Sequence, residues 1–236
     1  AFAQYDQARG VALSHSHKIS VMVNEEDHIR IQVLMPGNRL EEALSLAGLI
    51  DDYLESRLDI AYKEKFGYLT SCPTNVGTGL RVSVMTHLPA LVMTNYIQQV
   101  LGALGPLGLV ARGLYGEGSR AFGNIFQISN QVTLGKSEED TLTHLAAMSS
   151  QLAERELMAR DTLKQDAPLD TQDKVWRARG ILSNARLLTS EETFSLLSDD
   201  RMGIDMGILP KVNAGFISLL INSLQGNLQF RTDRIL

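Results

Sequence analysis

Alternating apolar and polar residues predict the strands of this chain. The alternation occurs over residues 18–23, over residues 30–35 and, most clearly, from Phe126 to Leu134. A period of two places successive side chains on opposite faces of a sheet. In the last of these stretches one face carries Phe126, Ile128, Val132 and Leu134, and the other carries Gln127, Ser129, Gln131 and Thr133. A shorter apolar run over residues 109–115 predicts a fourth strand.

Two long helices are predicted from a different spacing. Apolar residues three and four positions apart indicate a helix from Leu40 to about Lys65, with Asn38 as its N-cap. Ser137, which three acidic residues follow, is typical of an N-cap, and the helix after it is expected to run to about Lys164.

The last third of the chain carries weaker signals. Two further helical pieces are expected, one at residues 174–179 and one that begins at Ser190, where the cap is supplied by that serine and the glutamates after it. The polar segment 166–173 contains Pro168 and predicts a surface loop. Residues 222–236 show little periodicity, so we expect a mobile tail there.

The order of these elements predicts an α+β fold, because strands and helices do not alternate strictly along the chain. We expect a largely antiparallel β-sheet flanked by α-helices. Residues 1–221 are expected to form one domain, since 44% of the chain is hydrophobic and can fill a core of that size.

Composition and charge exclude several classes of function. The net charge of −5 gives no overall positive field for a nucleic-acid backbone or an anionic membrane. Pro and Gly interrupt the longest apolar runs, which fall short of the roughly 18 to 20 residues that a membrane span needs. The single cysteine, Cys72, can form no internal disulfide and favours a reducing compartment, so we expect a cytoplasmic protein.

Three arginines are candidates for binding an anion. Arg30, Arg81 and Arg112 each lie beside glycine or a polar loop, where backbone N–H groups can also face a ligand. Taken singly, such an arginine is more often a solvated or ion-paired surface residue. Together the three suit a triphosphate, because guanidinium groups donate paired hydrogen bonds to phosphate oxygens.

The candidate carboxylates are Glu25, Glu26 and Glu117. If the adjacent pair lies on a strand, its side chains point to opposite faces, so we expect at most one of them in a given pocket. A solvated turn is the alternative for this pair. Glu117 lies between two glycines and can project into a cleft.

The cysteine and the histidines are weaker candidates. A lone cysteine such as Cys72 is most often a small buried hydrophobe, although nearby arginines would favour its thiolate. His15 and His17 form a His-x-His pair without a third clustered ligand, so we assign no metal ligands. His87 is expected to be structural.

Three separated segments resemble the signature segments of the guanidino (phosphagen) kinases. They are residues 23–30 (VNEEDHIR), 72–81 (CPTNVGTGLR) and 112–118 (RGLYGEG). Within this family the chain is most similar to the bacterial protein-arginine kinases of the McsB type, through residues 70–91 and 123–137. The resemblance covers roughly residues 10–210 and implies the family's catalytic domain, which has a glutamine-synthetase-like fold.

The resemblance implies transfer of the γ-phosphoryl group of Mg-ATP to a guanidinium nitrogen. Glu26 and Glu117 would clamp and orient the guanidinium, Glu26 would also be the base, and Cys72 would lie against the same group. A guanidinium has a pKa above about 12, so a carboxylate cannot deprotonate it in the ground state, and proton loss accompanies or follows transfer. Catalysis is then mainly the alignment of a planar cation by two carboxylates.

On the nucleotide side, the resemblance assigns Arg30, Arg81 and Arg112 to the phosphates of ATP, where they neutralise the charge of the transition state. Glu25 would order water around Mg²⁺. The cofactors implied are therefore ATP and Mg²⁺.

Three departures from the family pattern accompany the resemblance. The small helical N-terminal domain of the family is absent, so we expect the chain alone to lose much of its rate without losing its fold. Met85 stands where creatine and arginine kinases carry a histidine near the adenine, which fits the protein-arginine kinase branch. Residues 231–236 hold at best a degenerate version of that branch's phosphoarginine-binding segment, so no allosteric control is carried over.

We therefore predict an ATP-dependent kinase of arginine side chains in other proteins. The alternatives are a catalytically silent module that binds a nucleotide or phosphoarginine, and a kinase of free arginine or another small guanidine. The resemblance implies a Clp-type protease, a heat-shock repressor and a zinc-binding activator protein as partners in protein quality control. It implies no direct binding of nucleic acid or membrane, and a homodimer is compatible with it.

Overall fold

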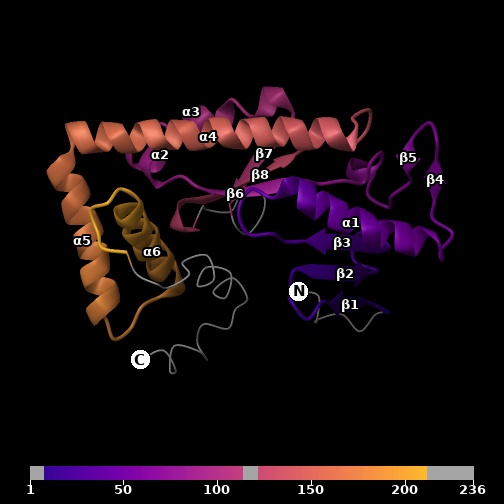
Figure 1. Cartoon of the computed structure of the whole chain (residues 1–236), viewed down its shortest axis with the longest axis horizontal. Coiled ribbons are helices and arrows are strands. Elements are labelled where there is room, and N and C mark those ends of the chain that lie inside the picture. Colours follow the sequence, from indigo (N-terminus) through magenta and orange to yellow (C-terminus); the bar gives the residue numbers. More distant parts are fainter. Residues whose placement is uncertain (1–7, 114–121, 212–236) are drawn as a thin grey trace. The chain divides into compact units, whose positions relative to one another are not determined.

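The computed structural model describes residues 8–113 and 122–211 (Figure 1). The chain divides into two compact units. The first unit consists of residues 1–84, 104–110 and 128–150, and the second consists of residues 85–103, 111–127 and 151–236.

The first unit contains a three-stranded antiparallel sheet of β1 (Gly10–Leu13), β2 (Ile19–Val23) and β3 (Ile29–Val33) (Figure 1). In its register Val21 lies opposite Ile31. Both strands predicted from the alternation near the N-terminus are therefore confirmed. The polar residues between them form a tight connection rather than a continuation of either strand.

Helix α1 (Leu40–Glu55) follows this sheet and packs against β3. Its predicted extension to Lys65 was wrong: the helix ends at Glu55, and the N–H of the C-cap residue Ser56 donates to the last turn. The predicted cap was also wrong. Arg39 occupies the N-cap position, not Asn38, and makes no side-chain capping hydrogen bond.

The segment after α1 forms a short hairpin of β4 (Tyr62–Lys63) and β5 (Gly67–Tyr68). The Tyr62 and Tyr68 rings meet edge to face, with 5.4 Å between their centroids. Cross-strand aromatic pairs of this kind stabilise a hairpin. The apolar residues whose spacing predicted more helix here therefore lie in a hairpin instead.

A second three-stranded sheet has the order β6-β8-β7, and its strands are Ser83–His87 (β6), Ile125–Asn130 (β8) and Leu109–Gly113 (β7). At one end the Asn130 N–H donates to the Val82 carbonyl, and at the other the Leu88 N–H donates to the Asn124 carbonyl. The residue number rises from 82 to 88 along β6 while that of its partner falls from 130 to 124 along β8, so the two strands are antiparallel.

Strand β8 is shorter than predicted. It ends at Asn130, whose side-chain amide donates to the Val132 carbonyl (3.2 Å) as the chain turns away. Val132 and Leu134 are consequently exposed and do not share the buried face of Ile128. The fourth predicted strand is confirmed as far as Gly113, where the described residues end.

Helix α4 (Glu138–Asp166) begins as predicted. The Ser137 hydroxyl oxygen accepts a hydrogen bond from the Asp140 N–H (3.0 Å), which confirms the cap. The helix ends two residues beyond Lys164, and its first half belongs to the first unit and its second half to the second unit.

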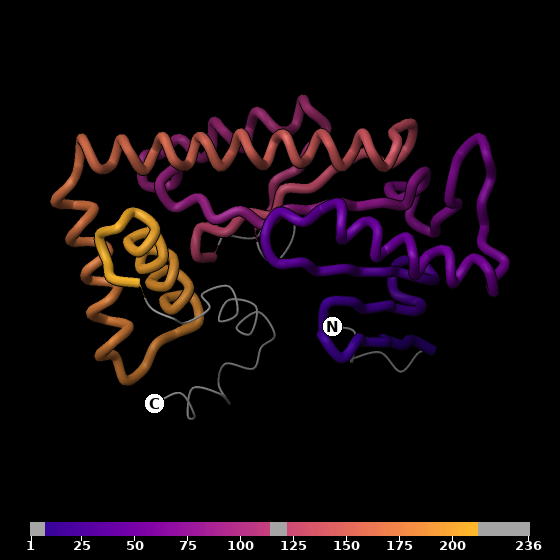
Figure 2. Tube along the Cα trace, viewed as in Figure 1, coloured from indigo at the N-terminus to yellow at the C-terminus, as the bar shows by residue number. Residues whose placement is uncertain are grey.

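The predicted surface loop at residues 166–173 was wrong. Helix α5 (Pro168–Asn184) begins there, and only Ala167 separates it from α4, so the chain turns sharply at that residue (Figure 2). Pro168 occupies the first turn, where a missing N–H costs no hydrogen bond. Proline therefore starts a helix here, and the predicted piece at 174–179 lies inside it.

Helix α6 (Ser190–Asp205) is present as expected, but its cap lies one residue earlier than predicted. The Thr189 hydroxyl oxygen accepts a hydrogen bond from the Glu192 N–H (3.2 Å). Capping by the residue before the first helical serine satisfies one of the free N–H groups of the first turn.

Two ion pairs join α5 and α6. The ammonium group of Lys174 lies 2.8 Å from the Asp199 carboxylate, and the Arg179 guanidinium pairs with Asp200. Both carboxylates are buried, and burial raises the pKa of Asp199. Removing either cation would leave a buried carboxylate unpaired, which is strongly unfavourable.

A buried carboxylate also caps α2 (Pro89–Met93), the helix that precedes α3 (Ile97–Gly102). Glu156 of α4 accepts hydrogen bonds from the N–H groups of Ala90 and Leu91, each at 3.0 Å. A negative charge at a helix N-terminus is favourable and satisfies N–H groups that have no partner within the helix. This contact lies entirely within the second unit.

Each unit has its own set of buried apolar side chains. Those of the first unit are Val82, Leu104, Leu109, Ile128, Leu142 and Leu145. Those of the second unit include Leu91, Leu152, Val175, Phe194, Met202 and Leu209. Helices and antiparallel sheets occur together in separate segments, which confirms the α+β class.

Two further points concern the extent of the chain. In the described residues, no helix combines the length and hydrophobicity that crossing a membrane requires. The expected tail at 222–236 lies outside the described residues, so the single domain over 1–221 and its tail remain predictions.

Candidate active site

The connection between β2 and β3 forms an acidic loop, residues 24–28. Asn24 has a φ of 56° and its N–H donates to the His28 carbonyl (2.9 Å), which closes the loop. Asparagine adopts this left-handed conformation more readily than most residues. The loop opens onto a cavity of about 310 Å³ lined by Ala8, Arg9, Asn24, Glu25, Glu26, Asp27, His28 and Ser71.

Glu25 and Glu26 both line this cavity, and the pair lies in a turn, which was the alternative to a strand with only one of them facing a given pocket. They belong to a loop, where the two-face rule for strands does not apply. The Glu25 carboxylate accepts hydrogen bonds from the Glu26 N–H (2.9 Å) and from Arg30 (3.2 Å), and these lower the pKa of Glu25. The Glu26 side chain is exposed.

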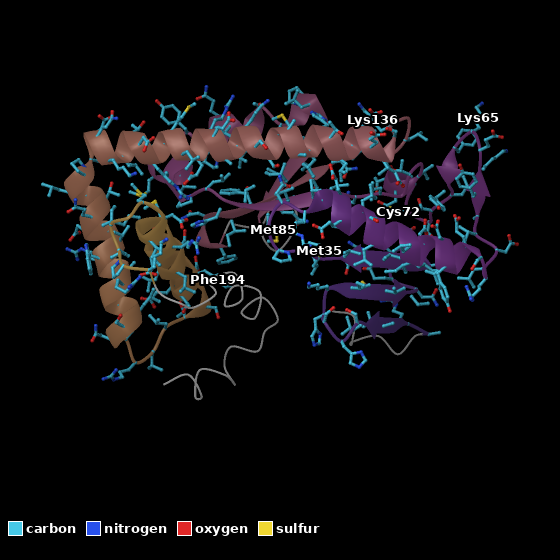
Figure 3. The ribbon with its side chains drawn as sticks, viewed as in Figure 1. Met35, Lys65, Cys72, Met85, Lys136 and Phe194 are labelled. Atoms are coloured by element: carbon cyan, nitrogen blue, oxygen red, sulfur yellow. The ribbon has the colours of Figure 1, made fainter. Side chains whose placement is uncertain are left out.

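Cys72, labelled in Figure 3, lies in the segment between β5 and β6, which we call the cysteine loop (residues 70–80). It is half-buried, and its thiol lies 3.0 Å from the Thr74 hydroxyl rather than in an apolar core. The Cys72 N–H donates to Asp27 of the acidic loop (3.1 Å). The structure thus brings the segments of Glu26 and Cys72 together within the first unit.

The far end of the cysteine loop is fixed by Thr133. Its hydroxyl lies 2.7 Å from the Val76 carbonyl and 3.0 Å from the Thr74 carbonyl, so both oxygens share its proton. Gly77 has a φ of +116°, and a Cβ there would lie 2.4 Å from the Thr133 carbonyl oxygen. Only glycine fits this approach, which explains one glycine of the motif.

Arg30 and Arg81 are both in the first unit and both exposed. Arg30 projects from β3 and pairs with Glu25, while Arg81 follows the cysteine loop directly before β6. An exposed ion pair such as Arg30 with Glu25 contributes only about 0 to 1 kcal/mol. A phosphate group can therefore replace Glu25 as the partner of Arg30 with little loss of stability.

The other two predicted residues lie elsewhere. Arg112 is in β7 and belongs to the second unit, where it is half-buried. Glu117 lies outside the described residues. The structure therefore brings Glu26, Cys72 and Arg30 into one unit with Arg81, and it describes Arg112 separately.

Two polar residues that support the site were not singled out from the sequence. Asp27 joins the acidic loop to the cysteine loop, and buried Asn130 bonds to the backbone on both sides of Arg81. Both lie inside the quoted motifs. For Asp27 the only signal in the sequence was a short carboxylate side chain directly after Glu26, and Asn130 had no such signal, because its partners lie 48 and 50 positions away.

His87 lies apart from this chemistry, in the second unit. Within the described residues, no three His, Cys, Asp or Glu side chains are grouped closely enough to hold a metal ion. The His87 ring lies 2.8 Å from the Ser198 hydroxyl, and burial lowers the pKa of His87 to about 3. The ring is therefore neutral at pH 7, as a structural histidine would be.

Comparison with known protein families shows to which family the chain is related. The family model described as ATP:guanido phosphotransferase, C-terminal catalytic domain, matches residues 1–159. The chain belongs to this family. The match includes all six predicted site residues, and a second model, the protein-arginine kinase McsB C-terminal domain, matches residues 168–236.

Curated relatives carry the name protein-arginine kinase. One from Bacillus subtilis is 52% identical over 221 residues, which cover 93% of this chain and 61% of the relative. Another, from Halalkalibacterium halodurans, is 53% identical over 228 residues, which cover 96% of this chain and 64% of the relative. The chain thus spans about three fifths of the length of the curated relatives it matches.

Solved structures agree on the fold. A lombricine kinase superposes with a TM-score of 0.59 at 27% identity, covering 69% of this chain and 44% of that one. A duplicated taurocyamine kinase from Schistosoma mansoni, with bound transition-state analogue components, gives the same TM-score at 24% identity over 81% of this chain and 29% of that one. The resemblance to guanidino kinases drawn from the three motifs is confirmed.

Proposed function

We propose that this chain carries the catalytic machinery of an ATP-dependent protein-arginine kinase. The observation that carries the proposal is the acidic cavity, in which Glu25, Glu26 and Asp27 meet at one loop of the guanido phosphotransferase domain. A cavity lined by carboxylates suits a guanidinium cation, and no carboxylate in it is buried. The sections of the chain that match protein-arginine kinases support arginine as the acceptor.

Glu26 is the proposed clamp and base for the guanidinium. Its carboxylate is exposed at the cavity, whereas Glu25 is already engaged by Arg30 and by a backbone N–H. Two oxygens of one carboxylate match two N–H groups of a planar guanidinium. Glu117 takes the role of the second clamp from its motif, and Cys72 lies beside the acidic loop through Asp27.

Arg30, Arg81 and Arg112 are the proposed ligands of the ATP phosphates. The exposed guanidinium groups of Arg30 and Arg81 fit phosphate oxygens chemically, since each can donate two parallel hydrogen bonds. Arg112 is assigned from its motif. Mg²⁺ would arrive with ATP, and Glu25 is the proposed carboxylate for its water shell, because Mg²⁺ keeps several waters and few protein ligands.

In the proposed transfer of the γ-phosphoryl group, one bond breaks and one bond forms. The bond between the γ-phosphorus and the bridging oxygen of ATP breaks, and a bond from that phosphorus to a guanidinium nitrogen forms. ADP leaves with the electron pair of the broken bond, and the guanidinium gives up one proton, which Glu26 accepts as the nitrogen loses its basicity. Arginines around the phosphates stabilise the charge that develops during transfer.

An arginine side chain of another protein is the acceptor that the site suits best. Glu26 is exposed on a surface loop, so a side chain that projects from a folded protein can reach it. The match of residues 168–236 to the McsB C-terminal domain supports the same branch of the family. A Clp-type protease, a heat-shock repressor and a zinc-binding activator remain predicted partners, and the cytoplasm remains the predicted location.

The choice of acceptor can be tested directly. The chain is incubated with Mg-ATP and either an arginine-rich protein or free arginine, and phosphoarginine is measured by mass spectrometry at neutral pH, because the bond is acid-labile. Label on the protein supports the proposal. Label on free arginine alone indicates a small-guanidine kinase, and binding of ATP without label on either acceptor indicates a silent module.

A further inference from the structure

The Asp27 carboxylate joins the two loops that carry the proposed guanidinium-binding groups. One oxygen, Oδ1, accepts a hydrogen bond from the Cys72 N–H (3.1 Å), and the other, Oδ2, accepts one from the Asn75 side-chain amide (2.7 Å). Asp27 directly follows Glu26, whereas its two donors lie 45 and 48 positions later in the chain. In the described part of the chain, two hydrogen bonds join the acidic loop to the cysteine loop, and the Asp27 carboxylate accepts both of them.

Each loop is closed by hydrogen bonds of its own. The acidic loop is closed by the bond from the Asn24 N–H to the His28 carbonyl (2.9 Å). The cysteine loop is closed by the bond from the Asn75 N–H to the Cys72 carbonyl (3.0 Å). Each loop thus keeps an internal hydrogen bond without Asp27, and what Asp27 adds is the link that fixes the distance between the loops and restrains Cys72.

We propose that Asp27 is a positioning residue that sets the spacing between the Glu26 carboxylate and the Cys72 thiol, and thereby the fit of the guanidine acceptor. This inference rests on the function proposed above. A guanidinium held on two edges tolerates little change in that spacing, because productive transfer needs the reacting atoms aligned. Asp27 exchanges no proton or phosphoryl group itself.

The kinetic consequence is selective for the acceptor. In Asp27→Ala, kcat/KM for an arginine-rich protein falls about tenfold or more, because the two sides of the acceptor site are no longer held together. KM for ATP stays within about twofold, since Arg81 and its support from Asn130 are untouched. Asp59→Ala removes an exposed aspartate outside the site and is the matched control. Equal losses for both substrates, or no loss for either, would overturn the inference.

An exchange of the two partners gives a sharper test. The double variant Asp27→Asn with Asn75→Asp keeps the net charge and allows both hydrogen bonds. The amide at position 27 accepts from the Cys72 N–H through its oxygen and donates through its nitrogen to the carboxylate at position 75. The exchange is expected to recover at least half of the kcat/KM lost in Asp27→Ala. An exchange no better than Asp27→Ala contradicts the proposed link.

A third readout does not depend on phosphoryl transfer. Cys72 is the only cysteine of the chain, so its alkylation by iodoacetamide reports on the cysteine loop alone. Asp27→Ala is expected to speed alkylation about threefold or more, because the loop opens locally once its tether is lost, and the exchange is expected to restore the original rate. An alkylation rate that does not change in any variant overturns the inference. A changed rate in a chain that forms no phosphoarginine supports the tether and rejects the proposed kinase activity instead.

Discussion

The side-chain amide of Asn130 holds the backbone on both sides of Arg81. Its oxygen accepts a hydrogen bond from the Val82 N–H (2.8 Å), and its nitrogen donates to the Leu80 carbonyl (3.0 Å). Asn130 is only 5% exposed, whereas Arg81 between the two bonds is exposed. A buried side chain from β8 thus fixes the position from which a proposed phosphate ligand projects.

Replacing Asn130 by alanine is expected to weaken both stability and nucleotide binding. The Val82 N–H and the Leu80 carbonyl lose their partner, which costs about 1 to 3 kcal/mol for each buried group left unsatisfied. Urea unfolding measures this loss, and calorimetry is expected to show a rise in the Kd for Mg-ATP. Asn184→Ala, at an exposed position whose side-chain amide donates only to the Gly180 carbonyl of α5, is the control and should change neither quantity by much. Unchanged ATP binding in a folded Asn130→Ala chain would show that Asn130 does not contribute to phosphate binding.

Arg81 itself is expected to matter for activity and not for folding. Arg81→Ala removes an exposed side chain, so the free energy of unfolding changes by less than about 0.5 kcal/mol. Phosphoryl transfer falls about a hundredfold or more, because one positive group at the developing charge is lost. Arg81→Lys restores the charge without paired hydrogen bonds and should recover only part of the rate. Full activity in Arg81→Ala would show that the phosphates bind elsewhere.

Two glycines are expected to respond to alanine in opposite directions. At Gly77, with φ +116°, a Cβ would lie 2.4 Å from the Thr133 carbonyl oxygen, so Gly77→Ala destabilises the chain by about 2 kcal/mol or more. At Gly48, inside α1, nothing lies within 4 Å of the added Cβ. Gly48→Ala is therefore expected to stabilise the chain by about 0.5 to 1 kcal/mol. Urea midpoints measure both, and a stable Gly77→Ala chain would mean that the cysteine loop has room to relax.

The second unit is expected to lose stability in acid through His87. Its pKa is about 3 in the folded chain because the ring is buried, against an ordinary value of about 6.5 when unfolded. Between these values the unfolded chain binds the extra proton, so stability falls as the pH is lowered from 6.5 towards 3, by up to about 1.4 kcal/mol per pH unit. His87→Gln removes this titration. The difference between urea midpoints at pH 7 and pH 5 should be smaller in that variant, and an equal difference in both chains would contradict the assignment to His87.

The sequence predicted the elements wherever one local signal dominates. The alternation that defines β2 and β3 and the serine cap of α4 are such signals, and both are confirmed. The predictions of secondary structure were wrong where one local signal is compatible with two structures. Pro168 can break a helix or start one, and only the end of α4 at Asp166 decides between them. The apolar spacing after Glu55 continues a helical pattern, but the Tyr62 and Tyr68 pair favours a hairpin.

The candidate site divides in a similar way. Glu26, Cys72, Arg30 and Arg81 were predicted because their chemistry and motifs are visible in the sequence, and their roles remain proposals. Asp27 and Asn130 could not be given a role in advance, because their function depends on partners 45 to 50 positions away in the chain. Periodicity and motif spacing report local structure and do not show which distant segments meet. Supporting residues of this kind become visible only once the fold is known.

The proposed role of Glu26 in phosphoarginine formation can be tested most directly by the rate of phosphoryl transfer. The initial rate of label transfer from Mg-ATP to an arginine-rich protein is measured at neutral pH for the original chain, for Glu26→Gln and for Glu41→Gln, which changes an exposed glutamate of α1 as a control. We expect Glu26→Gln to lose about a hundredfold or more of the rate while it still binds ATP, and the control to be unaffected. A Glu26→Gln chain that forms phosphoarginine at the original rate would contradict the proposed role of Glu26 as clamp and base.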